Sequence, residues 1–325
     1  MTNVIDRVLE SRYALYHGDC IEVLKGIPSN SVHYSIFSPP FANLYTYSNS
    51  DRDMGNCVND AQFVQHMNFL APEVYRVIMP GRLVSVHCMD LPLMKSKDGM
   101  LGLKDFPATL REIFEAAGFI YHSKVTIWKD PVVEMQRTKS LGLLHKQLKK
   151  DSCRSRQGTP DYIITLYKPG DNPEPVTHTN ESFPVTIWQQ YASPVWMDIR
   201  QGDTLQRQSA RDEHDEMHIC PLQLEVIRRC IALWTNETDI VLDPFSGIGS
   251  TGHEAVKYGR NYVGIELKTS YFKQSTGNLK MAVNEYNKLQ QDPLKLLTIL
   301  EGYEQHVNSQ STKIYKVTRN QRTLF

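Results

Sequence analysis

The spacing of apolar and polar residues along the chain predicts short strands that alternate with helices. Buried strands are expected at 32–37, 83–86, 119–128, 162–167, 239–242 and 262–265, where β-branched and aromatic residues cluster. Helical spacing of apolar residues predicts helices at 61–78, 105–117, 221–234, 253–258 and 270–289. This alternation is typical of an α/β fold, in which a mostly parallel twisted sheet carries helices on both faces.

Two polar stretches interrupt this alternation. Residues from about 129 to 160 are rich in Lys, Arg, Gln and Ser, and residues 168–217 are irregular and contain five prolines. We interpret both stretches as insertions within a single domain that spans residues 1–290. Residues 291–325 are polar and basic, and we expect them to form a C-terminal extension.

The total charge does not favour a nucleic-acid partner, whereas the local charge does. The chain has 36 Lys and Arg against 36 Asp and Glu, a net charge of zero. Between residues 135 and 158, however, seven basic residues accompany one acidic residue, Asp151. Such a segment can neutralise DNA phosphates, although a solvated helix surface is an open alternative. The candidate DNA-binding residues of this segment are Arg137, Lys139, Lys146, Lys149, Lys150, Arg154 and Arg156.

The cysteine spacing argues against disulfide-rich and zinc-binding proteins, and the distribution of apolar residues argues against secreted and membrane proteins. The six cysteines lack the close spacing of a disulfide framework or a zinc site, so we expect reduced thiols and no metal. No run of eighteen apolar residues is present, and residues 1–16 lack the apolar core of a signal peptide. We therefore expect a cytoplasmic protein that does not enter a membrane.

A glycine-rich segment, IVLDPFSGIGSTG at residues 240–252, predicts a strand, a tight turn and the start of a helix. Glu266 ends a second strand 23 positions after Asp243, where a carboxylate can bind both hydroxyls of a ribose. GIGSTG also fits the pattern of nicotinamide-binding loops, and a turn without a ligand is a third interpretation. A carboxylate at Asp243 disfavours a pyrophosphate and suits the ammonium group of a methionine moiety. The segment therefore favours S-adenosylmethionine.

A second motif, Ser38-Pro39-Pro40-Phe41, follows the strand predicted at 32–37. The two prolines fix the backbone and hold a carbonyl group in a set direction. That carbonyl and the Ser38 hydroxyl can accept hydrogen bonds from an NH₂ group, and Phe41 offers a ring on which a base can stack. The motif predicts a site that aligns an amino group for transfer, while a plain strand-ending turn remains the alternative.

Together the two motifs resemble those of the DNA amino-methyltransferases, which carry a [D/N/S]-P-P-[Y/F/W] tetrapeptide and a D-P-F-x-G-x-G-[S/T] cofactor loop. The tetrapeptide comes first here, as in the permuted members in which the catalytic half precedes the cofactor half. The resemblance extends over residues 16–279, and Asp19 matches a G-D segment whose acid lies by the adenine of the cofactor. Cys220 replaces the lysine expected in the segment before the cofactor half.

The resemblance implies a Rossmann-like methyltransferase fold in which residues 129–160 and 168–217 are target-recognition insertions. It also implies S-adenosylmethionine as cofactor, double-stranded DNA as partner and a bacterial or phage origin. The implied catalytic residues are Ser38, Pro39, Pro40 and Phe41. The implied cofactor-binding residues are Asp19, Asp243, Pro244, Phe245, Gly247, Gly249 and Glu266.

The target base would be flipped out of the helix, with Trp128 as a candidate aromatic wall opposite Phe41 or, alternatively, as a core residue. In the family that the chain resembles, Ser at the first tetrapeptide position is more typical of cytosine N4 methylation and Asp of adenine N6 methylation, so the resemblance favours cytosine N4 as target. A methyltransferase acting on RNA or protein, a nicotinamide oxidoreductase and a non-catalytic DNA-binding module are the other hypotheses, and a homodimer is left open.

Overall fold

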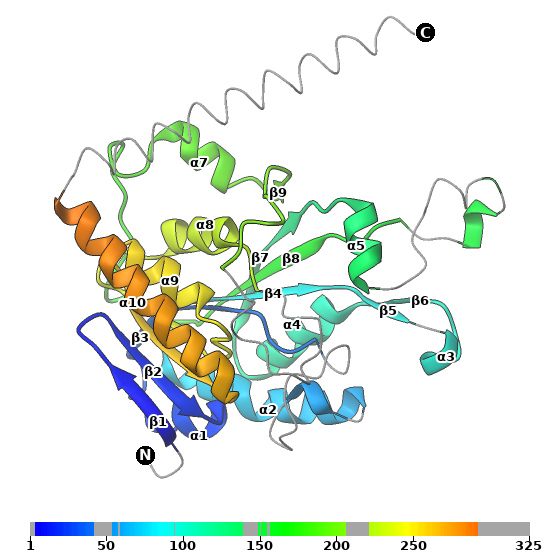
Figure 1. The fold of residues 1–325 in the computed structure, drawn as a ribbon, viewed down its shortest axis with the longest axis horizontal. Coiled ribbons are helices and arrows are strands. Elements are labelled where there is room, and N and C mark those ends of the chain that lie inside the picture. The colour runs from blue at the N-terminus through cyan, green and yellow to red at the C-terminus, as the bar shows by residue number, and fades with distance from the viewer. Residues whose placement is uncertain are drawn as a thin grey trace, which may run out of the picture.

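A computed structural model describes residues 4–41, 54–57, 59–93, 95–138, 149, 151–154, 157–205 and 221–291. Its centre is a nine-stranded sheet with the order β1-β2-β11-β10-β3-β4-β8-β7-β9 (Figure 1). These strands are β1 (Val4–Leu9), β2 (Tyr13–Gly18), β3 (Val32–Phe37), β4 (Ile78–Met89), β7 (Ile120–Ile127), β8 (Asp161–Tyr167), β9 (Val195–Trp196), β10 (Ile240–Asp243) and β11 (Asn261–Glu266). A separate two-stranded sheet pairs β5 (Leu91–Leu93) with β6 (Gly102–Lys104).

Five neighbouring strands, β2, β11, β10, β3 and β4, run parallel. Beyond them β8 runs antiparallel to both β4 and β7, so β7 points the same way as the parallel set. The carboxyl ends of β3, β4, β7, β10 and β11 therefore meet at one edge of the sheet. This is the edge at which α/β sheets bind ligands.

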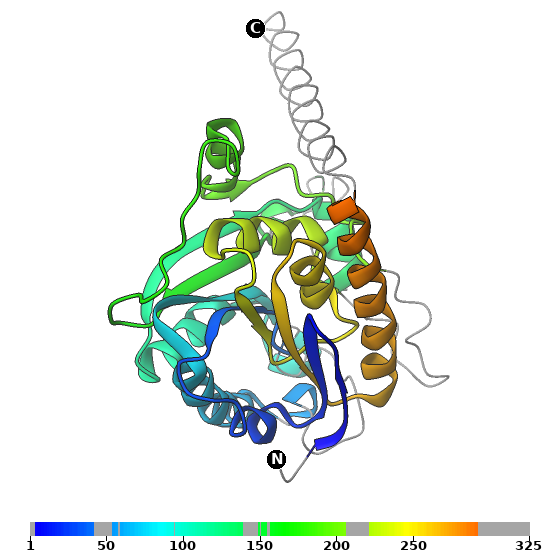
Figure 2. The same ribbon diagram turned by 90° about the vertical axis from the view of Figure 1, so that its left-hand side faces the viewer.

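Helices cover both faces of the sheet. One face carries α1 (Cys20–Leu24), α2 (Asp60–Val77) and α4 (Phe106–Ala116), and the other carries α8 (Leu224–Trp234), α9 (Ser250–Lys257) and α10 (Thr269–Gln291). In Figure 2 the blue and cyan helices lie on one side of the strands and the yellow and orange helices on the other. Short helices α3 (Lys95–Asp98), α5 (Pro131–Thr138) and α7 (Val185–Tyr191) lie outside these layers.

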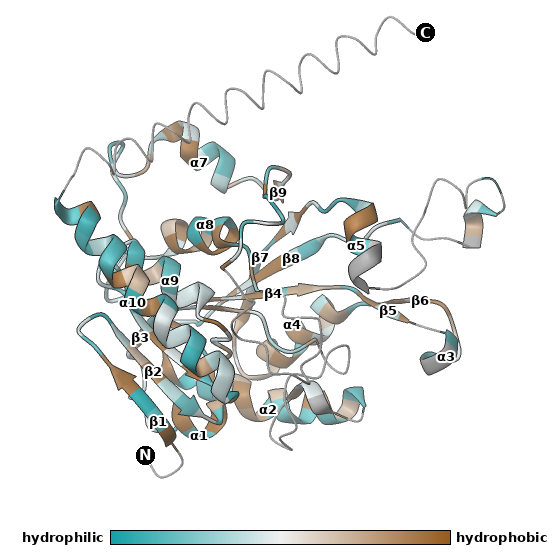
Figure 3. Cartoon of the chain, viewed as in Figure 1, coloured by the Kyte–Doolittle hydropathy of each residue, from teal (hydrophilic) through white to brown (hydrophobic). Residues whose placement is uncertain are grey.

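Two apolar cores result, one on each face of the sheet. Figure 3 shows the pattern behind them: hydrophobic residues on α4 and β4, and hydrophilic ones along α10 where it meets solvent. Among the described residues no helix is long and apolar enough to cross a membrane.

Most predicted elements are confirmed within a few residues, and α4 begins after the expected N-cap, Asp105, which accepts from Ala108 N. The expectation that 79–81 separates a helix from a strand starting at residue 83 is wrong. Strand β4 begins at Ile78 and runs through a bulge, because Gly81 takes a φ of +72° and donates its N–H to Lys168 O. The hairpin of β1 and β2 was not predicted, since the VIDRVL sequence of β1 lacks the alternation of apolar and polar residues that is typical of a strand.

The second polar stretch is partly integrated into the fold. Its strand β9 pairs with β7 at the sheet edge, and Trp196 is fully buried and donates from its indole N–H to Tyr191 O. Arg229 of α8 lies against the Trp196 ring and pairs with Asp198. Residues 168–205 therefore extend the main sheet and do not fold separately from it.

We predict opposite stability effects at two glycines. Gly249 has a φ of +86°, and a Cβ atom there would lie 2.5 Å from Ser275 Oγ, so Gly249→Ala should lower the free energy of unfolding by about 1–3 kcal/mol. Gly277 lies on an exposed turn of α10 with no neighbour within 4 Å, so Gly277→Ala should raise it by about 0.5–1 kcal/mol. Urea unfolding measures both, and equal effects would contradict the assigned backbone at Gly249.

Candidate active site

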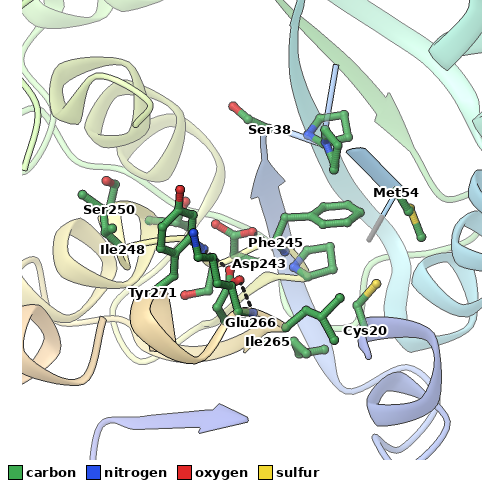
Figure 4. A pocket seen from close by; sticks show the side chains of 18 of the residues that line it. Cys20, Ser38, Met54, Asp243, Phe245, Ile248, Ser250, Ile265, Glu266 and Tyr271 are labelled. Atoms are coloured by element: carbon green, nitrogen blue, oxygen red, sulfur yellow. Dashed lines mark hydrogen bonds between the residues drawn. The ribbon is translucent and has the colours of Figure 1, made fainter. Parts of the chain in front are cut away.

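A cavity lies at the carboxyl edge of the sheet, between the ends of β3, β10 and β11. Its volume is about 170 Å³, and it opens to solvent. The tetrapeptide and the glycine-rich loop, about two hundred residues apart in sequence, both line it. In Figure 4 Ser38 lies above and Glu266 below, with Asp243 and Phe245 between them.

Asp243 ends β10 and lies almost fully buried in the cavity wall. Its Oδ1 accepts a hydrogen bond from Phe245 N at 2.9 Å. Burial raises the pKa of this carboxyl to about 7, although the hydrogen bonds from Thr251 and from the Phe245 backbone act to lower it. Because these hydrogen bonds offset only part of the cost of burying the carboxylate, a cation beside Asp243 would be favourable.

Glu266 ends β11 and holds the glycine-rich loop in place. Its Oε2 accepts from Gly247 N at 2.7 Å, and its Oε1 accepts from Lys268 N at 2.8 Å. Gly247 has a φ of +55°, which glycine adopts without strain. Each carboxylate oxygen can accept more than one hydrogen bond, so Glu266 can also receive the hydroxyl groups of a ligand.

Asp19 connects the cavity with the first helix. It is the N-cap of α1, and its Oδ1 accepts from Ile21 N and Glu22 N at 2.9 and 3.2 Å. These bonds fix its carboxylate at the end of β2, next to Cys20 in the cavity wall.

The tetrapeptide follows β3 directly and is held by β4 and α4. Ser38 Oγ lies 2.7 Å from His87 Nδ1. The Phe41 ring lies against His87 and Phe106, with centroid distances of 6.0 and 6.1 Å, and is 5% exposed. The ring contributes to the cavity wall as well as to the core.

Ten of the predicted tetrapeptide and cofactor residues line this one cavity: Ser38, Pro39, Pro40, Phe41, Asp19, Asp243, Pro244, Phe245, Gly247 and Glu266. Gly249 is not in the lining, and it packs against α10 instead. Sequence reasoning missed several lining residues, among them Met54, Ile248, Lys268 and Tyr271. Lys268 and Tyr271 could have been found, since they lie within five residues of Glu266. It also missed His87, which no motif indicates.

Trp128 lies elsewhere on the same edge. It is 45% exposed and lines a second hollow with Lys129, Val195 and Met197, so it is not a core residue. The basic segment leaves this region after β7 and returns at β8. Its ends are joined by Thr159, which donates to Glu134 Oε1 at 2.9 Å.

Little of the basic segment itself is described. Lys149 is exposed, and Arg137 and Arg154 lie in short helices whose side chains there are not described. The remaining basic residues of the prediction, Lys139, Lys146, Lys150 and Arg156, lie outside the described residues.

One cluster among the described residues has the donor set of a metal site: His33, Glu174 and Asp239. His33 Nδ1 accepts from Ile240 N, so its Nε2 carries a proton and donates to Glu174 at 3.0 Å. Asp239 pairs with buried Arg82 at 2.9 Å. Because the side chains of His33, Glu174 and Asp239 are already engaged with protein groups, the cluster is explained as a polar link between β3 and the start of β10.

The geometry can be compared with known proteins. A family model described as DNA methylase (N6_N4_Mtase) matches residues 32–277, well over half of the chain. The chain belongs to this DNA methylase family. The match confirms the resemblance to the amino-methyltransferases and does not support a nicotinamide oxidoreductase.

Two curated relatives of this methylase illustrate the family. Type II methyltransferase M.BglII of Bacillus subtilis is 24% identical over 272 residues, which cover 79% of this chain and 66% of that protein. The DNA adenine methyltransferase YhdJ of Escherichia coli K12 is 23% identical over 281 residues, which cover 82% of this chain and 83% of that protein. This methylase thus spans just under two thirds of the first relative and most of the second.

Two solved structures share the fold of this methylase. The PvuII DNA methyltransferase (cytosine-N4-specific) has a TM-score of 0.61 and 17% identity, covering 88% of this chain and 96% of that one. TTHA0409 from Thermus thermophilus, solved in complex with S-adenosyl-L-methionine, has a TM-score of 0.60 and 21% identity, covering 84% and 96%. The methylase therefore has the expected Rossmann-like methyltransferase fold.

We predict that the Asp243 carboxyl of the ligand-free methylase titrates near pH 7, well above the range of a free aspartate. Thr251→Val should raise this pKa further, because it removes a hydrogen bond that stabilises the carboxylate. Carboxyl ¹³C chemical shifts measured against pH test both expectations. A titration near pH 4 in the parent protein would show that the carboxyl is not desolvated.

Proposed function

We propose that this methylase transfers a methyl group from S-adenosylmethionine to the exocyclic amino nitrogen of a base flipped out of double-stranded DNA. The observation that carries the proposal is the shared cavity. Parallel pairing of β3 with β10 puts the Ser-Pro-Pro-Phe tetrapeptide beside the glycine-rich loop. A donor held by the loop and an amino group held by the tetrapeptide would then meet in one site.

The lining residues fit S-adenosylmethionine, which supplies a methyl group on a positively charged sulfur. Asp243 would bind the ammonium group of the methionine moiety, because a buried carboxyl with a raised pKa gains from a cation. Glu266 would accept the ribose hydroxyls, and Asp19 would lie by the adenine. The apolar side chains of Ile248 and Phe245 complete this half of the cavity.

The tetrapeptide would hold the target amino group. Ser38 Oγ and a carbonyl of the Pro-Pro unit would accept its two hydrogens, which turns the nitrogen lone pair toward the methyl group. Because the amino nitrogen is conjugated with the ring, this alignment is the main requirement of the reaction. Phe41, which is almost fully buried but lines the cavity, would contact the flipped base.

We infer cytosine N4 as the target, with adenine N6 as the alternative. Ser38 supports cytosine, because serine at this position resembles the cytosine-specific members. Both amino groups present the same donors to the tetrapeptide, however, so the product must be identified chemically.

DNA would approach the sheet edge between the cavity and the hollow beside Trp128. The hollow offers an exposed indole together with Lys129, and the basic segment starts from the same edge. Its lysines and arginines would neutralise phosphates, and Trp128 would contact the target region. The relatives named type II methyltransferases support a role in restriction–modification.

Incubation of the purified chain with methyl-labelled S-adenosylmethionine and unmodified mixed-sequence DNA tests the reaction. We expect N4-methyldeoxycytidine after nucleoside digestion and mass spectrometry. Ser38→Ala should lower kcat roughly 10²-fold, with unchanged cofactor affinity, because it removes an acceptor for the amino hydrogens. Detection of N6-methyldeoxyadenosine in the digest would instead identify adenine as the target base. Cofactor binding without any transfer to DNA would contradict DNA as substrate.

Replacing Lys146, Lys149 and Lys150 with Gln should weaken DNA binding and reduce its dependence on salt. Each lost phosphate contact lowers the slope of log affinity against log salt by about 0.9, so three contacts give up to about 2.7. Lys273, Lys280 and Lys288 of α10 are exposed and provide a charge-matched control triple. Fluorescence anisotropy at several salt concentrations measures the slopes, and equal slopes for both triples would place the DNA surface elsewhere.

A further inference from the structure

A chain of buried polar contacts leads from the cavity into the protein at Ser38. Ser38 Oγ lies 2.7 Å from His87 Nδ1, and His87 Nε2 lies 3.0 Å from Asp161 Oδ2. Asp161 in turn forms an ion pair with Lys129. Of these four residues only Ser38 lines the cavity, whereas His87, Asp161 and Lys129 are 5%, 0% and 8% exposed.

These residues come from four strands that are neighbours in the sheet. Ser38 follows β3, His87 lies in β4, Asp161 begins β8 and Lys129 comes two residues after β7. The contacts therefore run across the carboxyl edge of the sheet, at right angles to the strands. Phe41 packs over the imidazole of His87, with ring centroids 6.0 Å apart, and helps to keep water from it.

The contacts fix the direction in which each hydrogen points. The Asp161 carboxylate, paired with Lys129, can only accept a hydrogen bond, so His87 Nε2 must carry the proton and donate. In the neutral imidazole Nδ1 is then an acceptor, and the Ser38 hydroxyl donates to it. The lone pairs of Ser38 Oγ are thereby left for the cavity.

We propose that His87, Asp161 and Lys129 are positioning residues that make Ser38 a hydrogen-bond acceptor toward the target amino group, and that His87 takes up the proton released there. This inference rests on the proposed function. A free hydroxyl can donate or accept, whereas a carboxylate, as in tetrapeptides that begin with Asp, only accepts. The relay gives serine the acceptor behaviour of that carboxylate. The same order of groups orients the serine of Ser-His-Asp hydrolases.

The proton balance follows the same path. The amino nitrogen forms a bond to the methyl carbon of the sulfonium donor, and the sulfur keeps the electron pair of the broken bond. The nitrogen then carries one proton too many. That proton passes to Ser38 Oγ as the hydroxyl proton passes to His87 Nδ1. The imidazolium, stabilised by Asp161, returns its proton to solvent before the next turnover.

Asp161→Asn tests the direction of the relay. The amide N–H of the new side chain donates to His87 Nε2, which moves the imidazole proton to Nδ1 and turns the Ser38 hydroxyl toward the cavity as a donor. We expect kcat to fall roughly 10²-fold or more, with KM for cofactor and DNA within about twofold. Thr165→Val is the matched control, because it breaks the buried Ser85–Thr165 hydrogen bond between the same two strands and should leave kcat unchanged.

A double-mutant cycle separates the relay from a merely structural effect. In a Ser38→Ala background Asp161→Asn should lower kcat no further, because no hydroxyl remains to be oriented. In a Ser38→Asp background it should cost little, because a carboxylate accepts whichever way His87 is protonated. The proposal would be overturned if Asp161→Asn lowered kcat by the same factor in the Ser38→Ala background as in the parent. A rise in KM equal to the fall in kcat would also overturn it.

Histidine ¹⁵N chemical shifts of the full-length protein test the relay without any activity. The parent should show His87 protonated on Nε2, and Asp161→Asn should show it protonated on Nδ1. An Nδ1–H imidazole in the parent would overturn the relay even if DNA is methylated. Absence of methyl transfer in a parent with the expected Nε2–H imidazole would instead reject the proposed function.

Discussion

The parallel pairing of β10 with β3 is the constraint on which the rest of the site depends. Val241 lies opposite Tyr34 and Leu242 opposite Ser35, and Ser35 Oγ donates to Leu242 O at 2.9 Å. In this register the two strands end together, so Ser38 and Asp243 leave the sheet at the same edge. A shift of one residue would turn every side chain of one strand to the other face. The two apolar cores, one on each face, therefore hold the register and with it the cavity.

Some buried charges near the sheet are paired in the described part of the chain, whereas that of Asp243 is not. Arg82 of β4 pairs with Asp239, which directly precedes β10, and Lys129 after β7 pairs with Asp161 of β8, so opposite charges are in contact in both cases. At the end of β10, Asp243 is buried with hydrogen bonds but no cationic partner among the described residues, and its pKa rises to about 7. Buried charges are costly unless they are paired, so paired ones stabilise a geometry whereas an unpaired one favours a charged ligand. In the proposed reaction the Lys129–Asp161 pair would support proton acceptance at the tetrapeptide, and Asp243 would bind the cofactor at the loop.

The elements predicted most accurately are those whose apolar pattern lies within a few neighbouring residues. Strand β3 was predicted with both its ends, and α2 and β8 to within a residue, because their apolar periodicity is strong and contained in a few residues. The N-terminal hairpin was missed because β1 is an edge strand whose side chains are mostly exposed, so it lacks the apolar pattern of a buried strand. The start of β4 was misjudged because a Pro-Gly pair usually interrupts regular structure, and here a bulge and the Lys168 carbonyl accommodate it within the strand.

The amino-acid sequence by itself determined the two motifs, their chemistry and the α/β class, because each depends on residue types at short spacing. It also identified ten residues of one cavity, since the carboxyl ends of parallel strands share an edge. Only the tertiary structure decided that His87 and Asp161 lie behind Ser38, that Trp128 lines a separate hollow, and that Gly249 serves packing. These contacts join residues 49 to 74 positions apart or depend on the direction in which a side chain points. Such distances and directions are set by the order and register of the strands, which no local pattern encodes.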